Sequence, residues 1–207
     1  MKNTIVVISS NRGLEKQTKA SLAAMQAAGA MALMETGSAD VAFARNRALS
    51  WACNKLRDFP ERDSILMMDD DMEVPLETGQ ALLDKARALQ RPTAAVYSTL
   101  HARIAAARWP EKPGWWLCGL GIVAIPRALL LELEERSESY EQLGTYYTAF
   151  CWTGPYQGGW IAEDFRLSMN LGGVHLMPLG VGHIKKGALW PDDETLANIA
   201  KDGEPPQ

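Results

Sequence analysis

The segment that decides the fold reads Ser64-Ile65-Leu66-Met67-Met68-Asp69-Asp70-Asp71-Met72-Glu73-Val74-Pro75. Its four consecutive apolar residues, bounded by polar ones, are typical of a short buried β-strand. Three consecutive carboxylates follow at the place where that strand would end. Burying any of them without a partner would be costly, because adjacent carboxylates repel one another and lose their hydration.

A divalent cation would relieve this repulsion, and oxygen ligands favour a hard ion such as Mg2+ or Mn2+. Side chains alternate along an extended chain, so we expect Asp69 and Asp71 on one side and Asp70 on the other. The predicted metal-binding unit is therefore Asp69-x-Asp71, and Asp70 is the member expected to tolerate substitution. A solvated acidic turn after a strand is the alternative interpretation.

The composition is that of a globular protein with one domain. The chain has 207 residues, of which 47% are hydrophobic and 22% are charged, and this length can bury a substantial core. A formal net charge of -4 gives no global preference for nucleic acid or for an anionic membrane. Three cysteines far apart in the sequence are typical of free thiols in a reducing compartment.

No apolar run in the sequence is long enough to cross a bilayer. The first run, Ile5 to Ile8, is also shorter than the apolar region of a secretory signal peptide. We therefore expect a cytoplasmic protein with no membrane span.

Predicted strands and helices alternate along the chain. This order implies parallel βαβ units and an α/β fold class, with a mostly parallel central sheet flanked by helices. Residues 1–190 are expected to form this domain, and residues 191–207 an acidic tail with a frayed end. Strands are predicted at 5–8, 31–34, 65–68, 94–100, 117–126 and 174–177, and helices at 14–28, 40–56, 77–89, 127–140 and from 163 onward.

Ligands of such a sheet bind at the carboxyl ends of its strands. Arg45 and Arg47 lie two residues apart on a predicted helix and cannot point the same way, so one of them is expected at this edge or in the core. A long aromatic loop, residues 146–160, precedes Glu163 and Asp164, and loops of this kind are often functional. The polar or glycine-rich groups at predicted strand ends are Ser9-Ser10-Asn11-Arg12, Asp69 to Asp71, Gly119 with Gly121, and His183.

This order of motifs resembles a small glycosyltransferase of the GT-A fold. The similarity is to the large, family 2-like group that includes many bacterial and phage sugar transferases, and it covers about residues 5–186. It implies one Rossmann-like domain that transfers a sugar from a nucleotide-diphosphate sugar, with a UDP-sugar as the first candidate, to a hydroxyl acceptor. The residues that carry it are Ser9 to Arg12, Ala44-Arg45-Asn46, Asp69-x-Asp71, Gly119-x-Gly121, Glu163-Asp164 and His183.

The resemblance also implies roles for individual residues. Asp71 and His183 would bind Mn2+ or Mg2+, and Asp69 would contact the metal or the ribose. Asp164 would be the general base of an inverting reaction, with Glu163 as its partner. The implied nucleotide-sugar contacts are Ser9, Ser10, Asn11, Arg12, Arg45, Asp69, Asp70, Lys185 and Lys186, and the implied acceptor contacts are Gly119, Gly121, Trp115 and Trp160.

The resemblance leaves two acceptors possible, a glycan or a modified base in phage DNA.

Other functions also remain compatible with parts of the pattern. A metal-dependent phosphatase of the haloacid dehalogenase type uses Asp-x-Asp, but with threonine or valine where this chain has Glu73. A sugar-nucleotide pyrophosphorylase needs a glycine-rich basic loop after its first strand, and Ser9-Ser10-Asn11-Arg12-Gly13 matches that loop poorly. A non-catalytic nucleotide- or sugar-binding module would leave Glu163 and Asp164 only a helix-capping role.

Overall fold

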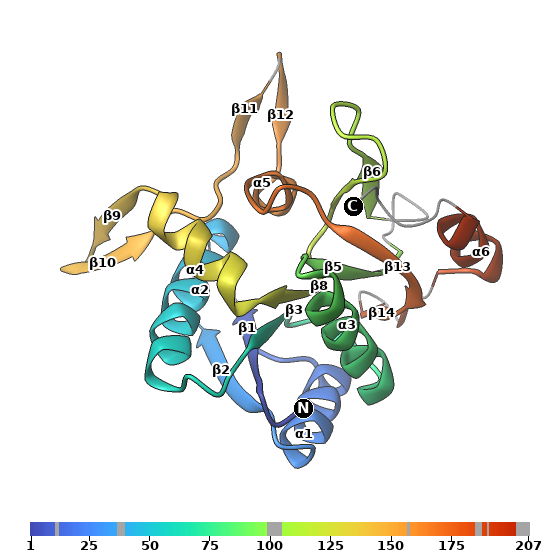
Figure 1. Cartoon of the computed structure of the whole chain (residues 1–207), viewed down its shortest axis with the longest axis horizontal. Helices are drawn as coiled ribbons and strands as arrows, with labels where there is room; N and C mark the ends of the chain where they lie inside the picture. Colours follow the sequence, from blue (N-terminus) through green and yellow to red (C-terminus); the bar gives the residue numbers. More distant parts are fainter. Residues whose placement is uncertain are drawn as a thin grey trace.

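Strands and helices alternate through the first half of the chain, as the sequence predicts (Figure 1). The computed structural model describes residues 1–10, 13–36, 40–98, 105–156, 158–184, 188–189 and 191–201. The first elements are β1 (Thr4–Ser10), α1 (Lys16–Ala27), β2 (Met31–Thr36), α2 (Val41–Asp58), β3 (Ser64–Asp69), β4 (Met72–Glu73), α3 (Leu76–Leu89) and β5 (Thr93–Val96).

A six-stranded sheet in the order β13-β5-β8-β3-β1-β2 forms the centre of the fold. Strand β1 pairs in parallel with β2 and β3, and β13 (His175–Gly180) pairs in parallel with β5. Only β8 (Ile122–Pro126) runs antiparallel to its neighbours β3 and β5 among these six strands. The predicted α/β class with a mostly parallel, Rossmann-like sheet is therefore confirmed.

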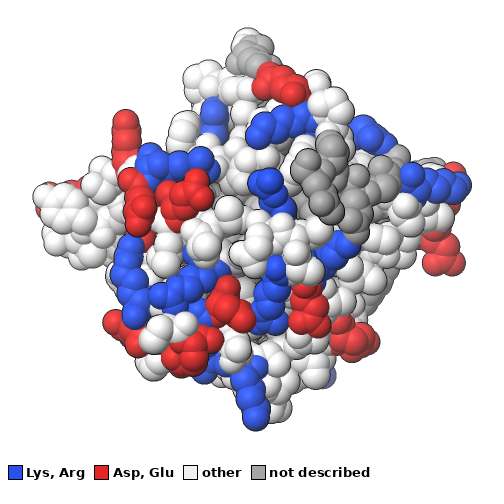
Figure 2. Space-filling model, in the orientation of Figure 1, with Lys and Arg blue, Asp and Glu red and all other residues white. Residues whose placement is uncertain are grey.

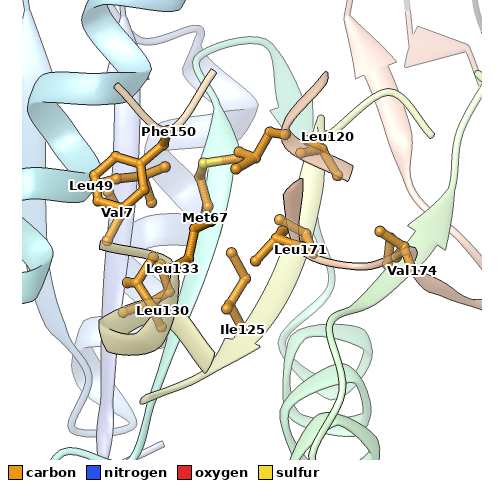
Figure 3. Close-up of a cluster of buried hydrophobic side chains, with 14 of the residues drawn as sticks. Val7, Leu49, Met67, Leu120, Ile125, Leu130, Leu133, Phe150, Leu171 and Val174 are labelled. Atoms are coloured by element: carbon orange, nitrogen blue, oxygen red, sulfur yellow. The ribbon is translucent and has the colours of Figure 1, made fainter. Parts of the chain in front are cut away.

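Apolar side chains bury both faces of this sheet. Val6 and Leu66 pack with α1 and α3 on one face, whereas Val7 and Met67 pack with α2 and α4 (Arg127–Arg136) on the other. Figure 3 shows the second cluster, where Leu49, Leu130 and Phe150 close over the strands. Burial on both faces explains why the strands are continuous apolar runs rather than alternating ones.

Short strands and hairpins complete the described residues. Within the described ranges, no helix is both long and apolar enough to cross a membrane. The remaining elements are β6 (Ala106–Arg108), β7 (Trp116–Cys118), β9 (Ser139–Gln142), β10 (Thr145–Thr148), β11 (Gly154–Tyr156), β12 (Gly159–Ile161), α5 (Glu163–Asn170), β14 (Gly182–Ile184), β15 (Ala188–Leu189) and α6 (Asp193–Lys201).

Several element boundaries differ from the prediction. The strand expected over 117–126 is divided into β7 and β8, because Gly119-Leu120-Gly121 leaves the sheet. The helix expected to reach residue 140 ends at Arg136, and the chain then enters β9. Most of the aromatic loop expected over 146–160 is built as the hairpins β9–β10 and β11–β12.

Residues 193–201 of the predicted acidic tail form the helix α6, which the sequence did not predict, and residues 203–207, expected to fray, lie outside the described residues. The helix packs against β13, with Thr195 and Ile199 buried and Leu196 against the core. These residues recur at positions i, i+1 and i+4, so an apolar stripe in an otherwise acidic segment faces the sheet.

We expect Ile199→Ala to lower the free energy of unfolding by about 2 kcal/mol, because it leaves a cavity under α6. The exposed neighbour Asn198 is the matched control, and Asn198→Ala should change stability by less than about 0.5 kcal/mol. Urea denaturation measures both. Equal stability of the two variants would show that α6 does not contribute to the cooperative fold.

Candidate functional site

The acidic triplet lies at the carboxyl edge of the sheet, but its side chains do not alternate as predicted. Strand β3 ends at Asp69, and Asp70 and Asp71 form the turn that leads into β4. The expectation that Asp69 and Asp71 share one side of an extended strand was therefore wrong. Each of the three carboxylates instead has its own partner.

Asp70 anchors the turn that follows β1. Its Oδ2 accepts a hydrogen bond of 2.8 Å from the Ser10 hydroxyl, which itself accepts one from the Gly13 amide. Its backbone oxygen accepts from the Thr18 hydroxyl at 2.9 Å and from the Glu15 amide at 3.0 Å. With only 7% of its surface exposed, Asp70 has a structural role, contrary to the expected tolerance of substitution.

Arg45 joins two carboxylates from distant parts of the chain. Its Nη2 lies 3.1 and 3.0 Å from the two carboxylate oxygens of Asp69, and its Nη1 lies 2.7 Å from Oε1 of Glu163. The arginine is 3% exposed, so it lies in the protein interior behind the sheet edge. Arg47 points elsewhere and pairs with the buried Glu35 at 3.1 Å.

Charge and burial oppose one another in this cluster. Burial raises the pKa of Asp69, and the guanidinium of Arg45 lowers it only partly. Burial likewise raises the pKa of Asp164 against the opposing effect of Arg45. Burial disfavours the charged form of Arg45, but Asp69, Asp164 and Glu163 outweigh it and hold its pKa above the ordinary value.

Helix α5 places Asp164 and Glu163 in its first turn, where carboxylates interact favourably with the helix dipole. The Phe165 amide donates a 2.7 Å hydrogen bond to Oδ1 of Asp164. Glu163 contacts Arg45 and accepts a 3.2 Å hydrogen bond from the Thr153 hydroxyl. Arg45 and Thr153 are therefore the bonded partners of Glu163, whereas the resemblance implied Asp164.

His183 meets Asp71 because β14 pairs antiparallel with β4. Its Nε2 lies 3.5 Å from Oδ2 of Asp71, and its Nδ1 lies 3.1 Å from the backbone oxygen of Ser98. A carbonyl oxygen only accepts, so Nδ1 carries the proton in this contact. In the neutral ring, Nε2 then directs a lone pair at a carboxylate oxygen.

Two facing lone pairs require a proton or a cation between them. Metal-bound histidines usually donate their second ring N–H to a carbonyl or carboxylate, as His183 does to Ser98. Two ligands with bonds of about 2.1 Å at right angles on one ion lie about 3 Å apart, close to the observed Asp71–His183 separation. This pair fits a divalent ion such as Mn2+, for which mixed nitrogen and oxygen ligands are suitable.

The rest of a metal's ligands would have to come from elsewhere. No group of three or more histidine, cysteine, aspartate or glutamate side chains in the described residues is placed to hold an ion. Both oxygens of Asp69, the other predicted ligand, accept hydrogen bonds from Arg45. Phosphate oxygens of a bound substrate and water are the ligands that Mg2+ commonly adds to one or two carboxylates.

Gly119 and Gly121 make room for the ring of Tyr97, a residue that sequence reasoning missed. A Cβ on Gly119 would lie 2.2 Å from the Tyr97 hydroxyl oxygen, and one on Gly121 would lie 2.9 Å from its ring. The Tyr97 hydroxyl accepts a 3.3 Å hydrogen bond from the Gly121 amide. The ring also meets that of His183 edge-on, with centroids 5.3 Å apart, so Tyr97 supports the imidazole of His183.

The predicted acceptor tryptophans lie in different environments. Trp115 packs against Gly173, and the Arg91 guanidinium lies 5.1 Å from its ring centroid, so Trp115 is engaged in packing. Trp160 is 73% exposed on β12, three residues before Glu163. Four further predicted contacts, Asn11, Arg12, Lys185 and Lys186, lie outside the described residues.

Asn46, next to Arg45 on α2, fixes the segment that leads to α5. Its Nδ2 donates to the backbone oxygen of Cys151 at 2.9 Å, and its Oδ1 accepts from the Cys151 amide at 3.0 Å. Ser9 lies beside Asp69 in the sheet register. One turn of α2 therefore positions groups from both β3 and α5.

No family model and no curated protein matches the sequence. The structure is similar to the crystal structure of A197 from STIV, with a TM-score of 0.61 and 16% identity over 92% of this chain and 91% of that one. At this identity the likeness shows a shared fold. A glycosyltransferase involved in the glycosylation of the major capsid of PBCV-1 matches 62% of each chain, with a TM-score of 0.39 and 13% identity, too low to carry an argument.

We expect Arg45→Met to lower the free energy of unfolding at pH 7 by about 3 kcal/mol, because it leaves Asp69 and Glu163 uncompensated. The control is Arg57→Met at the other end of α2, where the half-exposed Arg57 pairs with Glu134 and should contribute less than about 1 kcal/mol. Chemical denaturation compares the two. Equal losses would contradict the special role given to Arg45.

Asp164→Asn should make the protein more stable at pH 8, by about 1 kcal/mol, the usual size of a stabilising substitution. The raised pKa of Asp164 means that the folded state binds its proton more tightly than the unfolded state. Stability from this group is present near pH 4 and is lost as the pH rises through the folded-state pKa. The difference in the free energy of unfolding between the variant and the wild-type protein should therefore decrease as the pH falls toward 4.

Denaturation at a series of pH values tests this expectation. The control is Asp58→Asn, since the side chain of Asp58 is 57% exposed at the end of α2. The control should change stability by less than about 0.5 kcal/mol across this range. A loss of stability at pH 8 in Asp164→Asn would show that the ionised carboxylate is favourably bound in the fold.

Proposed function

We propose that this protein is a metal-dependent glycosyltransferase that moves a sugar from a nucleotide-diphosphate sugar to a hydroxyl acceptor. The observation that carries the proposal is the meeting of two kinds of group at one sheet edge. Asp71 and His183 face one another as a pair suited to a divalent ion. Asp164, a half-buried carboxylate with a raised pKa, interacts electrostatically with Arg45, whose guanidinium also bonds Asp69.

Asp71 and His183 would hold Mn2+ or Mg2+. Such an ion, when bound, stabilises the negative charge that grows on a departing diphosphate. Ser9, at the end of β1 beside Asp69, would contact the nucleoside of the donor, and a UDP-sugar is the first candidate. Asp69 would contact the ribose, with its orientation fixed by Arg45 through both carboxylate oxygens.

Asp164 would act as the general base. The acceptor oxygen forms a bond to the anomeric carbon of the sugar, the bond from that carbon to the diphosphate oxygen breaks, and the acceptor proton goes to Asp164. Attack from the face opposite the leaving group inverts the configuration. A carboxylate whose pKa is raised by burial is a stronger base than an exposed one, which suits this role.

The site disfavours two of the alternatives, the phosphatase and the binding module. A phosphatase of the haloacid dehalogenase type would need the first aspartate of the motif as its nucleophile. Both oxygens of Asp69 accept hydrogen bonds from a buried arginine, which reduces their nucleophilicity. A non-catalytic binding module would have no use for Asp164, whose burial raises its pKa and costs stability at neutral pH.

We expect UDP with Mn2+ to raise the melting temperature of the protein. A ligand at 100 times its Kd stabilises the folded state by about 2.7 kcal/mol, which corresponds to a rise of about 5 °C or more for a protein of this length. Asp71→Ala, or removal of the metal with EDTA, should abolish the rise. The exposed Asp58→Asn is the control and should retain it. If no nucleoside diphosphate raises the melting temperature of the wild-type protein, the transferase proposal fails.

Asp164→Asn should retain this thermal shift but lose turnover by a factor of about 10² to 10⁴, the range of general-base catalysis. The amide can still accept the hydrogen bond from the Phe165 amide, so the local fold should persist. Release of UDP from the donor in the presence of acceptor measures turnover. Unchanged turnover would remove Asp164 as the base.

A further inference from the structure

A cavity of about 820 Å³ lies between the C-terminal ends of α4 and α5 and the base of the β9–β10 hairpin. Its volume is in the range of small-molecule sites, about 300–1,000 Å³. Its lining includes the apolar side chains of Leu133, Met169 and Trp152 and the polar ones of Arg136, Glu138 and Asn170.

One lining residue of the cavity is next in the chain to a residue that bonds Glu163 of the proposed catalytic site. Trp152 lines the cavity, and the next residue, Thr153, donates its hydroxyl hydrogen bond to Glu163. The residue before it, Cys151, is held to α2 by both polar atoms of the Asn46 side chain. The position of Trp152 relative to Glu163 is therefore fixed from both sides.

Helix α5 sets the distance between the cavity and the proposed base. Asp164 lies in its first turn and Asn170, a lining residue, at its last position. Asn170 is six positions after Asp164, which corresponds to about 9 Å along the helix axis. A ligand that fills the cavity and reaches Asp164 must therefore be longer than one sugar ring.

The chemistry of the lining favours a neutral ligand rich in hydroxyl groups. Trp152 is 46% exposed, and the Arg166 guanidinium lies 4.6 Å from its ring centroid and restrains it. Arg136 and Glu138 carry opposite charges at the cavity. Between Ala149 and Ala162 the chain has no charged residue at all.

We propose that this cavity binds the acceptor, and that the acceptor is a neutral oligosaccharide. The apolar face of one ring would lie against Trp152, and hydroxyl groups would pair with Arg136, Glu138 and Asn170. The free end of the chain would present its hydroxyl to Asp164. This assignment rests on the proposed transferase function and names the acceptor class for it.

Nucleic acid suits this surface less well. Binding of a phosphate backbone needs a basic stripe or patch, and its affinity falls steeply with salt. On the face drawn in Figure 2, positive and negative side chains are interspersed and no broad basic area is visible. The described surface on this face therefore favours an uncharged acceptor over DNA.

An array of neutral oligosaccharides, followed by ligand-observed NMR on the best binder, tests the assignment. Trp152→Ala should weaken binding at least tenfold, and Glu138→Gln should weaken it several-fold. The control is Tyr146→Ala, which removes an aromatic side chain that is 70% exposed on β10 and outside the cavity lining. All three residues are at the surface, so the variants should fold.

The thermal shift by UDP and Mn2+ distinguishes the two proposals. If that shift occurs but no neutral oligosaccharide binds or accelerates UDP release, the acceptor assignment is overturned and the transferase stands. If oligosaccharides bind in a Trp152-dependent way and no nucleoside diphosphate gives a shift, the cavity is an oligosaccharide site, but the transferase falls and the acceptor role falls with it. Acceleration of UDP release by DNA but by no neutral oligosaccharide would also overturn the oligosaccharide assignment.

Discussion

The buried guanidinium of Arg45 is the interaction on which the candidate site depends. It holds Asp69, at the end of a central strand, and Glu163, at the start of α5, within one hydrogen-bonded cluster. Without a cation here, two or three carboxylates would face one another in a partly dry environment, at a large cost in free energy. Arg45 makes it possible for β3 and α5 to meet, and thus for the proposed donor and acceptor sides to share one edge.

The three adjacent aspartates have different roles because the chain turns directly after the first of them. Asp69 pairs with the arginine, Asp70 ties down the turn after β1, and Asp71 faces His183 across the β4–β14 ladder. Repulsion within the triplet is thereby relieved by three different partners. Of these, only the Asp71–His183 pair places a lone pair against a carboxylate, so this is where a divalent ion adds most.

The sequence predicts part of the fold and of the candidate site. The rest depends on contacts between distant residues, which a sequence pattern does not reveal. The apolar run of β3 identifies a buried strand, and the polar residues after it identify the edge at which the candidate site lies, because both signals are local. Arg45 and Glu163 are 118 residues apart, and no local periodicity in the sequence predicts their pairing. Tyr97 follows β5 directly, and only the folded chain shows that its ring fills the space above Gly119 and Gly121.

The most direct test of the central claim is the anomalous diffraction of Mn2+ in crystals grown with UDP. We expect one strong manganese peak within about 2.0–2.3 Å of both Oδ2 of Asp71 and Nε2 of His183, with diphosphate oxygens completing its ligands. Absence of manganese from this pair, with UDP bound, would contradict the account. So would manganese bound at another place in the same crystal.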